Sequence, residues 1–377
     1  MELKEVRDEI DVIDNQLVEL FEQRMNAVRK VAEYKIEHNL PIFNSKRERE
    51  IVASLSGKVK PELSTYTKIL YNTLFDVSRS YQAKAIFKTS AASEKINKAL
   101  ENTPKMFPAS AVVACQGTEG AYSQQACEKL FYNPTIIYFD SFRSVFEAVK
   151  SGICKYGVLP IENSIQGSVT QVVDLMGEYD FSIVKSAKIQ VSHALLAKKK
   201  NAEIKEVFSH PQAIGQCDNF LGKLGAKVTV YDNTAAAARM VAESERDDIA
   251  AIASPKCAEL YGLKIVKEGI TNSDNNHTRF ICISKDMEIY PGADRISLKL
   301  NVSHKPGALY ELISKFAALG INLTKIESRP IPGKDFEFMF YFDMAVSVYS
   351  PELMSIISEL SAENDSFVML GAYSELG

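Results

Sequence analysis

The first 40 residues contain neither proline nor glycine, so no helix-breaking residue interrupts this stretch. Within it, apolar residues recur with alternating steps of three and four, the spacing that aligns side chains along one stripe of an α-helix. The stripe runs through Leu3, Val6, Ile10, Ile13, Leu17 and Leu20. We therefore predict a single helix of about 35 residues, which exceeds the usual length in globular domains and indicates a helical bundle or a helix shared between subunits.

Two cations interrupt the apolar stripe. Arg24 takes the next position after Leu20, and Lys35, eleven residues further on, returns to within roughly 20° of the same face. A buried unpaired charge is costly, so these side chains need either an acidic ligand or a glutamate of a neighbouring helix. Arg7 lies about 25 Å from Arg24 along the helix axis. If both arginines bind substrate they serve different sites, and that arrangement implies a dimer.

Two further helices are expected in the same region. Residues 44–48 begin the second, where Ser45 and Glu48 form a capping box. The third is predicted from Ser64 to Phe87, with a buried face and two polar residues one turn apart beside it. The buried face consists of Tyr66, Leu70, Leu74, Val77 and Tyr81, and the polar residues are Ser78 and Gln82.

Together these residues resemble an all-helical chorismate mutase of the intertwined-dimer type, which would occupy residues 1–88. The resemblance implies a set of chorismate-binding residues: Arg7, Arg24, Lys35, Asn44, Arg47, Glu48, Ser78 and Gln82. In such a site Arg24 and Arg47, with Arg7 of the partner chain, would bind the two carboxylates. Lys35 and Gln82 would act catalytically at the breaking ether oxygen, and Glu48 would bind the hydroxyl group.

The chemistry of a Claisen rearrangement suits this set. The reaction needs no acid, base or nucleophile, only a folded substrate and donors aimed at the ether oxygen, where negative charge develops. The planar fork of arginine matches a carboxylate. Asn44 departs from the family pattern, in which aspartate is frequent at this position. Asparagine can still bond the substrate hydroxyl or cap the second helix, but it removes a charge, so binding is expected to be altered there.

The composition shifts to Ser, Ala, Asn and Lys between residues 89 and 109, which predicts a linker. From residue 110 to 285, short apolar runs rich in β-branched residues alternate with helical patterns, which favours an α/β fold. The predicted strands cover residues 111–115, 136–139, 156–159, 205–208, 227–230, 249–252 and 280–283. The chain is expected to leave a first lobe after Ile189, build a second lobe up to Leu263 and return through a loop carrying Thr278.

Four polar motifs adjoin these strands, at residues 117–123, 160–164, 209–212 and 276–280. Each alone has a structural explanation, such as a helix cap at Asn163 or Ser164, or a cap at His210 before Pro211. In this order, however, they resemble the signature of prephenate dehydratases, whose fold is two-lobed and similar to periplasmic binding proteins. The resemblance implies a prephenate-binding set made up of Ser123, Asn163, Ser164, Ser209, Thr278 and Arg279.

Loss of carbon dioxide and hydroxide from prephenate is driven by aromatisation, so the enzyme must mainly assist departure of the hydroxyl group. The resemblance assigns this catalytic role to Thr278, by hydrogen-bonded proton donation. Arg279 would be a carboxylate partner or a structural clamp. His210 precedes a proline at a helix start and is interpreted as structural.

The last region, residues 294–377, shows the order βαββαβ, which is ferredoxin-like. Strands are expected at 296–302, 321–328, 336–346 and 367–370, a helix at 309–319, a second helix from Pro351, and a turn at Pro332-Gly333. Residues 304–309 and 327–330 resemble the phenylalanine-binding motifs of dehydratase ACT domains. The resemblance implies an effector site for L-phenylalanine at Gly307, Ala308, Leu309, Glu327 and Ser328.

Composition excludes several other classes. The net charge of −4 and the lack of a dense basic run give no reason to expect nucleic acid as a partner. No apolar stretch is long enough for a membrane span and the N-terminus is charged, so a cytoplasmic protein is expected. The six cysteines are scattered and are interpreted as reduced, buried apolar residues. We predict no metal and no nucleotide cofactor, because neither metal-ligand spacing nor a phosphate-binding glycine motif occurs.

These resemblances cover nearly all of the chain outside the linker. They imply a multidomain enzyme of phenylalanine biosynthesis that carries a chorismate mutase, a prephenate dehydratase and an L-phenylalanine sensor, assembled as a homodimer or homotetramer. A regulatory binding protein that has lost catalysis is one alternative, against which Thr278 and Arg24 argue. Fusion of the mutase to a prephenate dehydrogenase is another, against which the missing GxGxxG motif argues.

Overall fold

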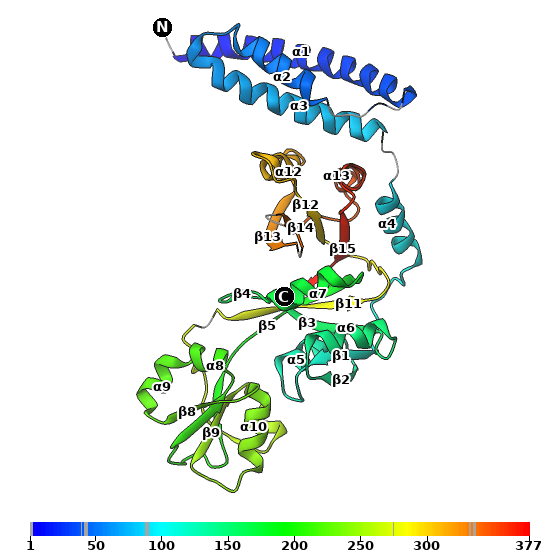
Figure 1. Cartoon of the computed structure of the whole chain (residues 1–377). Coiled ribbons are helices and arrows are strands. Elements are labelled where there is room, and N and C mark those ends of the chain that lie inside the picture. The colour runs from blue at the N-terminus through cyan, green and yellow to red at the C-terminus, as the bar shows by residue number, and fades with distance from the viewer. Residues whose placement is uncertain are drawn as a thin grey trace. The chain divides into compact units, whose positions relative to one another are not determined.

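The computed structural model describes residues 3–38, 40, 44–86, 90–273, 275–331, 333–334 and 337–377. The chain divides into two compact units, each built from separated parts of the sequence (Figure 1). The first comprises Met1–Lys98 and Ile296–Met369, and the second comprises Ala99–Arg295 and Leu370–Gly377.

The first unit begins with the predicted long helix, α1 (Leu3–Glu37), which is 35 residues long as expected. It is followed by α2 (Ser45–Ser56), the short 3-10 helix η1 (Pro61–Leu63), α3 (Ser64–Ile86) and α4 (Ala91–Asn102). Both α1 and α2 pack against α3. The predicted end of α3 at Phe87 lies outside the described residues.

The apolar stripe on α1 is exposed in the single chain. Only Met25 and Ala32 are buried among the described residues of α1, whereas Leu17 is 54% exposed. The prediction of a buried face on α3 is also wrong for the single chain, because Tyr66 is 69% exposed and Leu70 55%. Periodicity identifies an apolar stripe but does not say what covers it.

The start of α2 differs from the expected capping box. Asn44, not Ser45, is the N-cap, and its side chain accepts a hydrogen bond from the Arg47 backbone N–H. Asparagine is as good an N-cap as serine, so the residue one position earlier takes that role. The Glu48 side chain is thereby left available for the tertiary contact described below.

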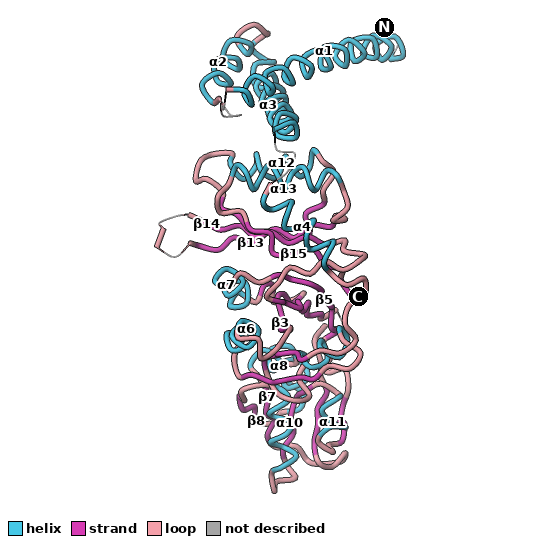
Figure 2. The backbone as a smooth tube through the Cα atoms, turned by 90° about the vertical axis from the view of Figure 1, so that its right-hand side faces the viewer, coloured by secondary structure: helices cyan, strands magenta, loops and turns pink. Residues whose placement is uncertain are grey.

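The C-terminal part of the first unit has the predicted order of strands and helices. Its elements are β12 (Arg295–Asn301), α12 (Ala308–Ala318), β13 (Asn322–Pro330), β14 (Phe338–Ala345), α13 (Pro351–Glu363) and β15 (Val368–Tyr373). The four strands form a sheet in the order β13-β14-β12-β15, and both helices lie on the same face of it (Figure 2). Gly307, with φ of 85°, immediately precedes α12. Of the turn predicted at Pro332-Gly333, Pro332 lies outside the described residues.

The second unit consists of two α/β lobes. The first lobe is built on a sheet ordered β16-β5-β11-β3-β1-β2, with β4 paired to β3. Its strands are β1 (Val112–Gln116), β2 (Thr135–Phe139), β3 (Tyr156–Asn163), β4 (Gly167–Ser168), β5 (Ser182–Gln190), β11 (His277–Ser284) and β16 (Glu375–Leu376). Its helices are α5 (Tyr122–Leu130), α6 (Phe142–Lys150) and α7 (Thr170–Glu178).

The second lobe is built on a five-stranded sheet ordered β10-β6-β9-β7-β8. Its strands are β6 (Ala194–Ala197), β7 (Glu206–Ser209), β8 (Lys227–Val230), β9 (Ile249–Ala253) and β10 (Lys264–Lys267). Its helices are α8 (Pro211–Gln216), α9 (Asp218–Leu224), α10 (Thr234–Glu243) and α11 (Lys256–Leu260). The chain crosses into this lobe at Val191–His193, as predicted, and returns to the first lobe at β11.

All seven predicted α/β strands are present, but β4, β5, β6, β10 and β16 were not predicted. The most consequential correction concerns Thr278, which was expected in a loop and instead lies inside β11, opposite Asn163 of β3 and Ile189 of β5. All six cysteines are free and buried, which confirms their interpretation as apolar residues. Within the described part of the chain, no helix is long and apolar enough to cross a membrane.

Candidate active sites

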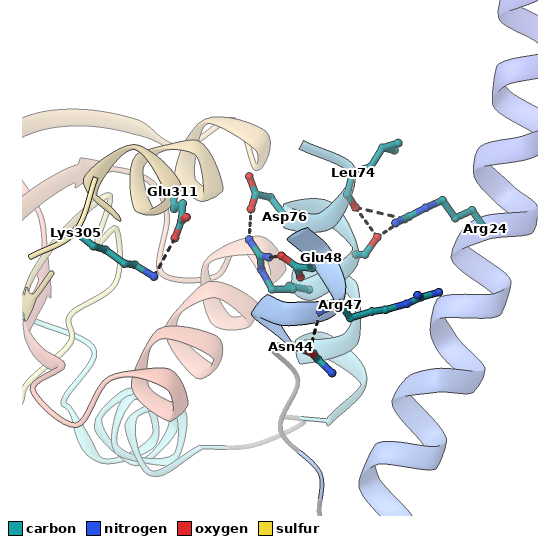
Figure 3. Close-up of polar contacts among 10 residues, drawn as sticks. Arg24, Asn44, Arg47, Glu48, Leu74, Asp76, Lys305 and Glu311 are labelled. Atoms are coloured by element: carbon teal, nitrogen blue, oxygen red, sulfur yellow. Dashed lines mark hydrogen bonds and ion pairs between the residues drawn. The ribbon is translucent and has the colours of Figure 1, made fainter. Parts of the chain in front are cut away.

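The first candidate site lies where α1 meets α3. The Arg24 guanidinium donates hydrogen bonds to the Ser78 hydroxyl and, at 3.4 Å, to the Leu74 carbonyl (Figure 3). Its carbon also lies 5.7 Å from the centre of the Phe75 ring. Burial lowers the pKa of Arg24 from its usual value. No carboxylate among these contacts neutralises the arginine, so its guanidinium is suited to an anionic ligand.

Lys35 and Gln82 meet at the same helix pair. The Lys35 ammonium donates to the Gln82 side-chain oxygen at 3.2 Å, and Gln82 is buried. Burial lowers the pKa of Lys35, and the negative charge of Glu48 acts in the opposite direction. Five of the predicted chorismate-binding residues therefore take part in side-chain contacts between the three helices: Arg24, Lys35, Glu48, Ser78 and Gln82.

Arg79 is a member of this site that the sequence did not indicate. Its guanidinium donates to the Glu48 carboxylate at 2.5 Å and also pairs with Asp76 one turn back on α3. The Arg79 side chain is only 13% exposed. Burial alone would lower the pKa of Arg79, but the hydrogen bond and charge of Glu48, together with the charges of Asp76 and Glu311, outweigh it and raise the pKa. The i,i+3 spacing of Asp76 and Arg79 is visible in the sequence, but the link to α2 is not.

The other predicted chorismate-binding residues lie apart from this group. Asn44 is occupied as the cap of α2, and Arg47 is largely exposed, with Glu50 at 3.9 Å. In Figure 3 the Arg47 side chain extends from α2 toward α1. Arg7 is exposed near the start of α1, about 25 Å along the helix from Arg24 at 1.5 Å per residue. Within one chain, Arg7 therefore does not join the site.

The second candidate site is a cleft of about 430 Å³ in the α/β unit. Residues of both lobes line it, including Tyr122, Ser123, Asn163, His193, His210, Gln212, Gln216, Asn233 and Thr278. Of the predicted prephenate-binding residues, Ser123, Asn163 and Thr278 are brought together here. A cleft between two lobes can enclose a small polar ligand and exclude water from it.

Asn163 fixes the orientation of Thr278. Its side-chain N–H donates to the Thr278 hydroxyl oxygen at 3.0 Å and to the Asn276 side-chain oxygen at 2.8 Å. The Asn163 side-chain oxygen in turn accepts from the backbone N–H groups of Ile165 and Gln166. Because the Thr278 oxygen already accepts a hydrogen bond, its own hydrogen is free to be donated to a ligand in the cleft.

Three predicted residues are occupied by structural contacts. The Ser209 hydroxyl is fully buried and donates to the Ile252 carbonyl at 2.6 Å. The Ser164 hydroxyl donates a hydrogen bond to the Asn275 carbonyl and accepts one from the His277 backbone N–H, at the start of β11. Arg279 pairs with Glu162 at 3.2 Å, which fits the clamp interpretation. The His210 side chain caps α8 by accepting a hydrogen bond from the Gln212 backbone N–H, which agrees with the prediction of a structural role for His210.

His193 and Gln216 are lining residues that no sequence motif indicated. His193 follows the end of β5, and its ring nitrogen Nε2 lies 3.1 Å from the Gln216 side-chain oxygen. Burial lowers the pKa of His193 to about 4, so the imidazole is neutral near pH 7. His193 lies in the connection between β5 and β6, and Gln216 is at the end of α8. These segments are apart in the sequence and meet at the cleft only in the folded protein.

A smaller cavity of about 380 Å³ lies in the C-terminal part of the first unit, and of the five predicted effector-binding residues only Leu309 is among its described lining residues. Its lining includes His304, Pro306, Leu309, Phe338 and Phe340. Ser328 of β13 is paired with Phe340 of β14, and Glu327 with Tyr341. Phe340 of β14 thus lines the cavity together with Leu309 of the first predicted effector motif, and it is paired in the sheet with Ser328 of the second.

Comparison with known proteins assigns a family to each of the two regions that carry these sites. Residues 6–83 match the family model of chorismate mutase type II, and residues 113–288 match that of prephenate dehydratase. The bifunctional chorismate mutase/prephenate dehydratase of Aquifex aeolicus is 31% identical over 381 residues, covering 99% of this chain and 98% of its own. Arogenate dehydratase/prephenate dehydratase 2 of Arabidopsis thaliana is 36% identical over 310 residues, covering 78% of this chain and 81% of its own.

Among solved structures, the prephenate dehydratase of Arthrobacter aurescens in complex with L-Phe is 26% identical, with a TM-score of 0.64. That match covers 70% of this chain and 89% of the other. The helical region thus corresponds to a mutase and the two-lobed region to a dehydratase. The chain belongs to the family of bifunctional chorismate mutase/prephenate dehydratases, and it is an enzyme with both activities.

Proposed function

We propose that the two activities reside at the two sites described above and that L-phenylalanine inhibits the enzyme through its C-terminal βαββαβ region. The observation that carries the assignment of the dehydratase site is the hydrogen bond from Asn163 to the Thr278 hydroxyl oxygen. It leaves Thr278 with one proton to donate, inside a cleft of a size that suits a small dicarboxylate.

In the mutase, Arg24 binds one carboxylate of chorismate. Lys35 and Gln82 aim their donors at the ether oxygen, whose negative charge grows as the C–O bond breaks. Lys35 now donates to Gln82, so substrate replaces that contact. Glu48, held by Arg79, accepts a hydrogen bond from the substrate hydroxyl. The reaction proceeds because the substrate is held folded, without any proton transfer to the protein.

In the dehydratase, the C–C bond to the ring carboxylate breaks and its electron pair enters the ring while the C–O bond to the hydroxyl breaks. The oxygen leaves as water after gaining one proton. Thr278 donates the hydrogen bond through which that proton arrives, and solvent supplies the net proton. Aromatisation provides the driving force, so orientation of the leaving hydroxyl is the main task of the protein.

Feedback inhibition is proposed to act at the cavity beside Gly307. Leu309, Phe338 and Phe340 offer an apolar wall for the ring of L-phenylalanine. The start of α12 suits its carboxylate, because the helix begins directly after Gly307 and no side chain in the described part of the chain caps it. The Arthrobacter relative forms a complex with L-Phe. The ligand inhibits only if it binds one arrangement of the enzyme more tightly than another.

The proposal is tested by incubating the purified full-length chain with chorismate and measuring phenylpyruvate. Thr278→Ala is expected to lower the dehydratase kcat by about 100- to 10,000-fold, the usual contribution of a positioned proton donor. Thr278→Ser keeps the hydroxyl and should retain far more activity. Mutase activity should not change in either variant. Equal dehydratase activity of the Ala and Ser variants would remove Thr278 from the mechanism.

The same assay separates the proposal from a regulatory binding protein. A chain that binds prephenate and L-phenylalanine but forms no phenylpyruvate would support the alternative. Phenylpyruvate formation that is inhibited by L-phenylalanine supports the proposal. If millimolar L-phenylalanine does not lower the dehydratase rate of the full-length enzyme, the proposed feedback inhibition is wrong.

A further inference from the structure

His193 occupies the crossover between the two lobes of the dehydratase unit. It lies between the end of β5 and the start of β6, and it is only 2% exposed. Its carbonyl accepts from the Ile270 backbone N–H, so the chain returning from β10 holds its position. Its ring meets the Tyr122 ring edge to face, with centroids 5.9 Å apart. Tyr122 and Thr278 line the same cleft.

Among the described residues, one ring nitrogen of His193 has no hydrogen-bond partner. Nε2 lies 3.1 Å from the Gln216 side-chain oxygen, which can only accept, so Nε2 carries the hydrogen. Nδ1 then carries a lone pair, and it is buried without a hydrogen-bond partner among the described residues. A buried unpaired acceptor costs free energy, so its retention in a binding cleft points to a ligand that completes it.

The substrate offers one group that fits this lone pair. Prephenate presents two ionised carboxylates and a keto oxygen, all of which only accept hydrogen bonds. Its ring hydroxyl is the single donor, and it is also the group that leaves. A neutral imidazole acceptor repels the carboxylates and selects the hydroxyl.

We propose that His193 Nδ1 accepts a hydrogen bond from the ring hydroxyl of prephenate and thereby directs a lone pair of the hydroxyl oxygen toward the Thr278 hydroxyl. This inference rests on the proposed role of Thr278. His193 takes no proton and changes no bond. It orients the leaving group so that the proton arriving through Thr278 meets an oxygen lone pair instead of the O–H bond.

The first test compares three replacements of His193 in the full-length chain. His193→Asn keeps a side-chain oxygen near the position of Nδ1, whereas His193→Gln reaches the position of Nε2 and His193→Ala keeps neither. We expect Gln and Ala to lower the dehydratase kcat roughly 10-fold or more and Asn to retain most of it, with a smaller effect on KM. Mutase activity serves as the internal reference, and thermal unfolding checks that each dehydratase unit is folded.

The outcome pattern decides the inference. Wild-type kcat in all three variants, or a Gln variant at least as active as Asn, overturns it. If Thr278→Ala also keeps full activity, the proposed function itself fails. If Thr278→Ala is inactive while the His193 variants keep the wild-type dehydratase kcat, only the inference about His193 fails.

The second test changes the tautomer through Gln216. Gln216→Glu places a carboxylate beside Nε2–H, which raises the pKa of the imidazole and promotes protonation at Nδ1. Protonation removes the acceptor, so dehydratase kcat should fall as pH is lowered from 8 to 6, more steeply than in the wild type. The other titratable groups lining the cleft are Tyr122, His210 and Asp232.

The double variant Gln216→Glu with His193→Asn controls for those groups. It lacks an imidazole at position 193, so the added pH dependence should disappear. A Gln216→Glu enzyme whose pH profile matches the wild type overturns the inference, and so does an added pH dependence that persists in the double variant.

Discussion

At the scale of single residues, Arg79 shows how the mutase site depends on a side chain that need not touch substrate. It joins Glu48 of α2 to Asp76 of α3, and all three side chains are largely shielded from water. Burial raises the pKa of Asp76, while the charge of Arg79 acts to lower it. Arg79 therefore links the two carboxylates and orients the one expected to meet chorismate.

Arg79→Met is expected to lower mutase kcat/KM by about 10- to 100-fold, the scale of loss when a catalytic group is misplaced by about 1 Å. Arg79→Lys keeps the charge but not the fork, so it should recover part of the loss. Arg29→Met is the matched control, because Arg29 forms an exposed i,i+4 pair with Glu33 at 4.0 Å and lies outside the Glu48–Arg79–Asp76 contacts. A folded Arg79→Met enzyme with wild-type kinetics would contradict the positioning role.

At the scale of secondary-structure elements, the last strand of the chain belongs to the dehydratase sheet. β16 pairs in parallel with Ser186 and Ala187 of β5, and the Glu375 carboxylate meets Lys188 at 2.9 Å. β5 also pairs with β11, where Ile189 lies opposite Thr278. The C-terminus thus supports the strand that positions the proposed catalytic threonine.

Deleting residues 374–377 removes this edge strand and exposes backbone groups of β5. The expected cost is about 1 to 3 kcal/mol in the free energy of unfolding of the dehydratase unit, from lost and unsatisfied hydrogen bonds. Dehydratase kcat should fall while mutase kcat stays unchanged. Glu375→Gln is the control: it keeps the strand and removes the ion pairs of its carboxylate with Lys188 at 2.9 Å and Arg295 at 3.8 Å, so it should cost less than the deletion. Unchanged melting of the truncated chain would refute the supporting role of β16.

The start of α12 offers a second prediction at this scale. Gly307 has φ of 85°, a conformation that a β-branched residue adopts only with strain, although an added Cβ would meet no atom within 4 Å. Gly307→Val should therefore lose inhibition by L-phenylalanine and also destabilise its region.

Gly307→Asn separates those two effects, because asparagine tolerates the left-handed conformation. It should keep near-wild-type stability while adding a side chain beside the proposed effector cavity. Inhibition curves for L-phenylalanine against dehydratase rate provide the measurement. If both variants are inhibited like the wild type, the effector does not bind at Gly307.

At the scale of the whole molecule, the exposed stripe on α1 indicates what a single chain lacks. Ile10, Ile13, Leu17 and Leu20 are each nearly half exposed or more, on a helix that also carries Arg7. Burial of such side chains is worth roughly 1.5 to 3 kcal/mol each, so a second copy of the helix is a favourable cover. In that arrangement Arg7 of one chain could complete the Arg24 site of the other.

Mixing inactive chains tests this arrangement. Arg24→Ala should cost mutase about 2 to 5 kcal/mol in transition-state binding, and Arg7→Ala should also be impaired. If sites are shared, mixed dimers of the two variants contain one site with both arginines intact, so part of the activity returns after subunit exchange. Absence of any recovery in confirmed mixed dimers would reject a shared site.

The sequence alone predicted much of this molecule because its signals are local. The apolar period and the absence of proline and glycine predicted the length of α1, β-rich runs located seven strands, and strand and helix patterns predicted the order of the C-terminal elements. The motif residues Ser123, Asn163 and Thr278 were predicted from their resemblance to the prephenate dehydratase signature. Such features depend on neighbouring residues, so they can be recognised without a fold.

Only the tertiary structure decided which partners meet across the sequence. Arg79 joins Glu48 across 31 positions, and the hydroxyl of Thr278 meets Asn163 across 115. Ser209 was predicted to contact substrate, yet its hydroxyl is bonded to Ile252, while His193 and Gln216 converge on the cleft without any motif. The physical reason is that the environment of a polar side chain, and hence whether it binds a ligand or the protein itself, is set by strand pairing and helix packing between distant segments.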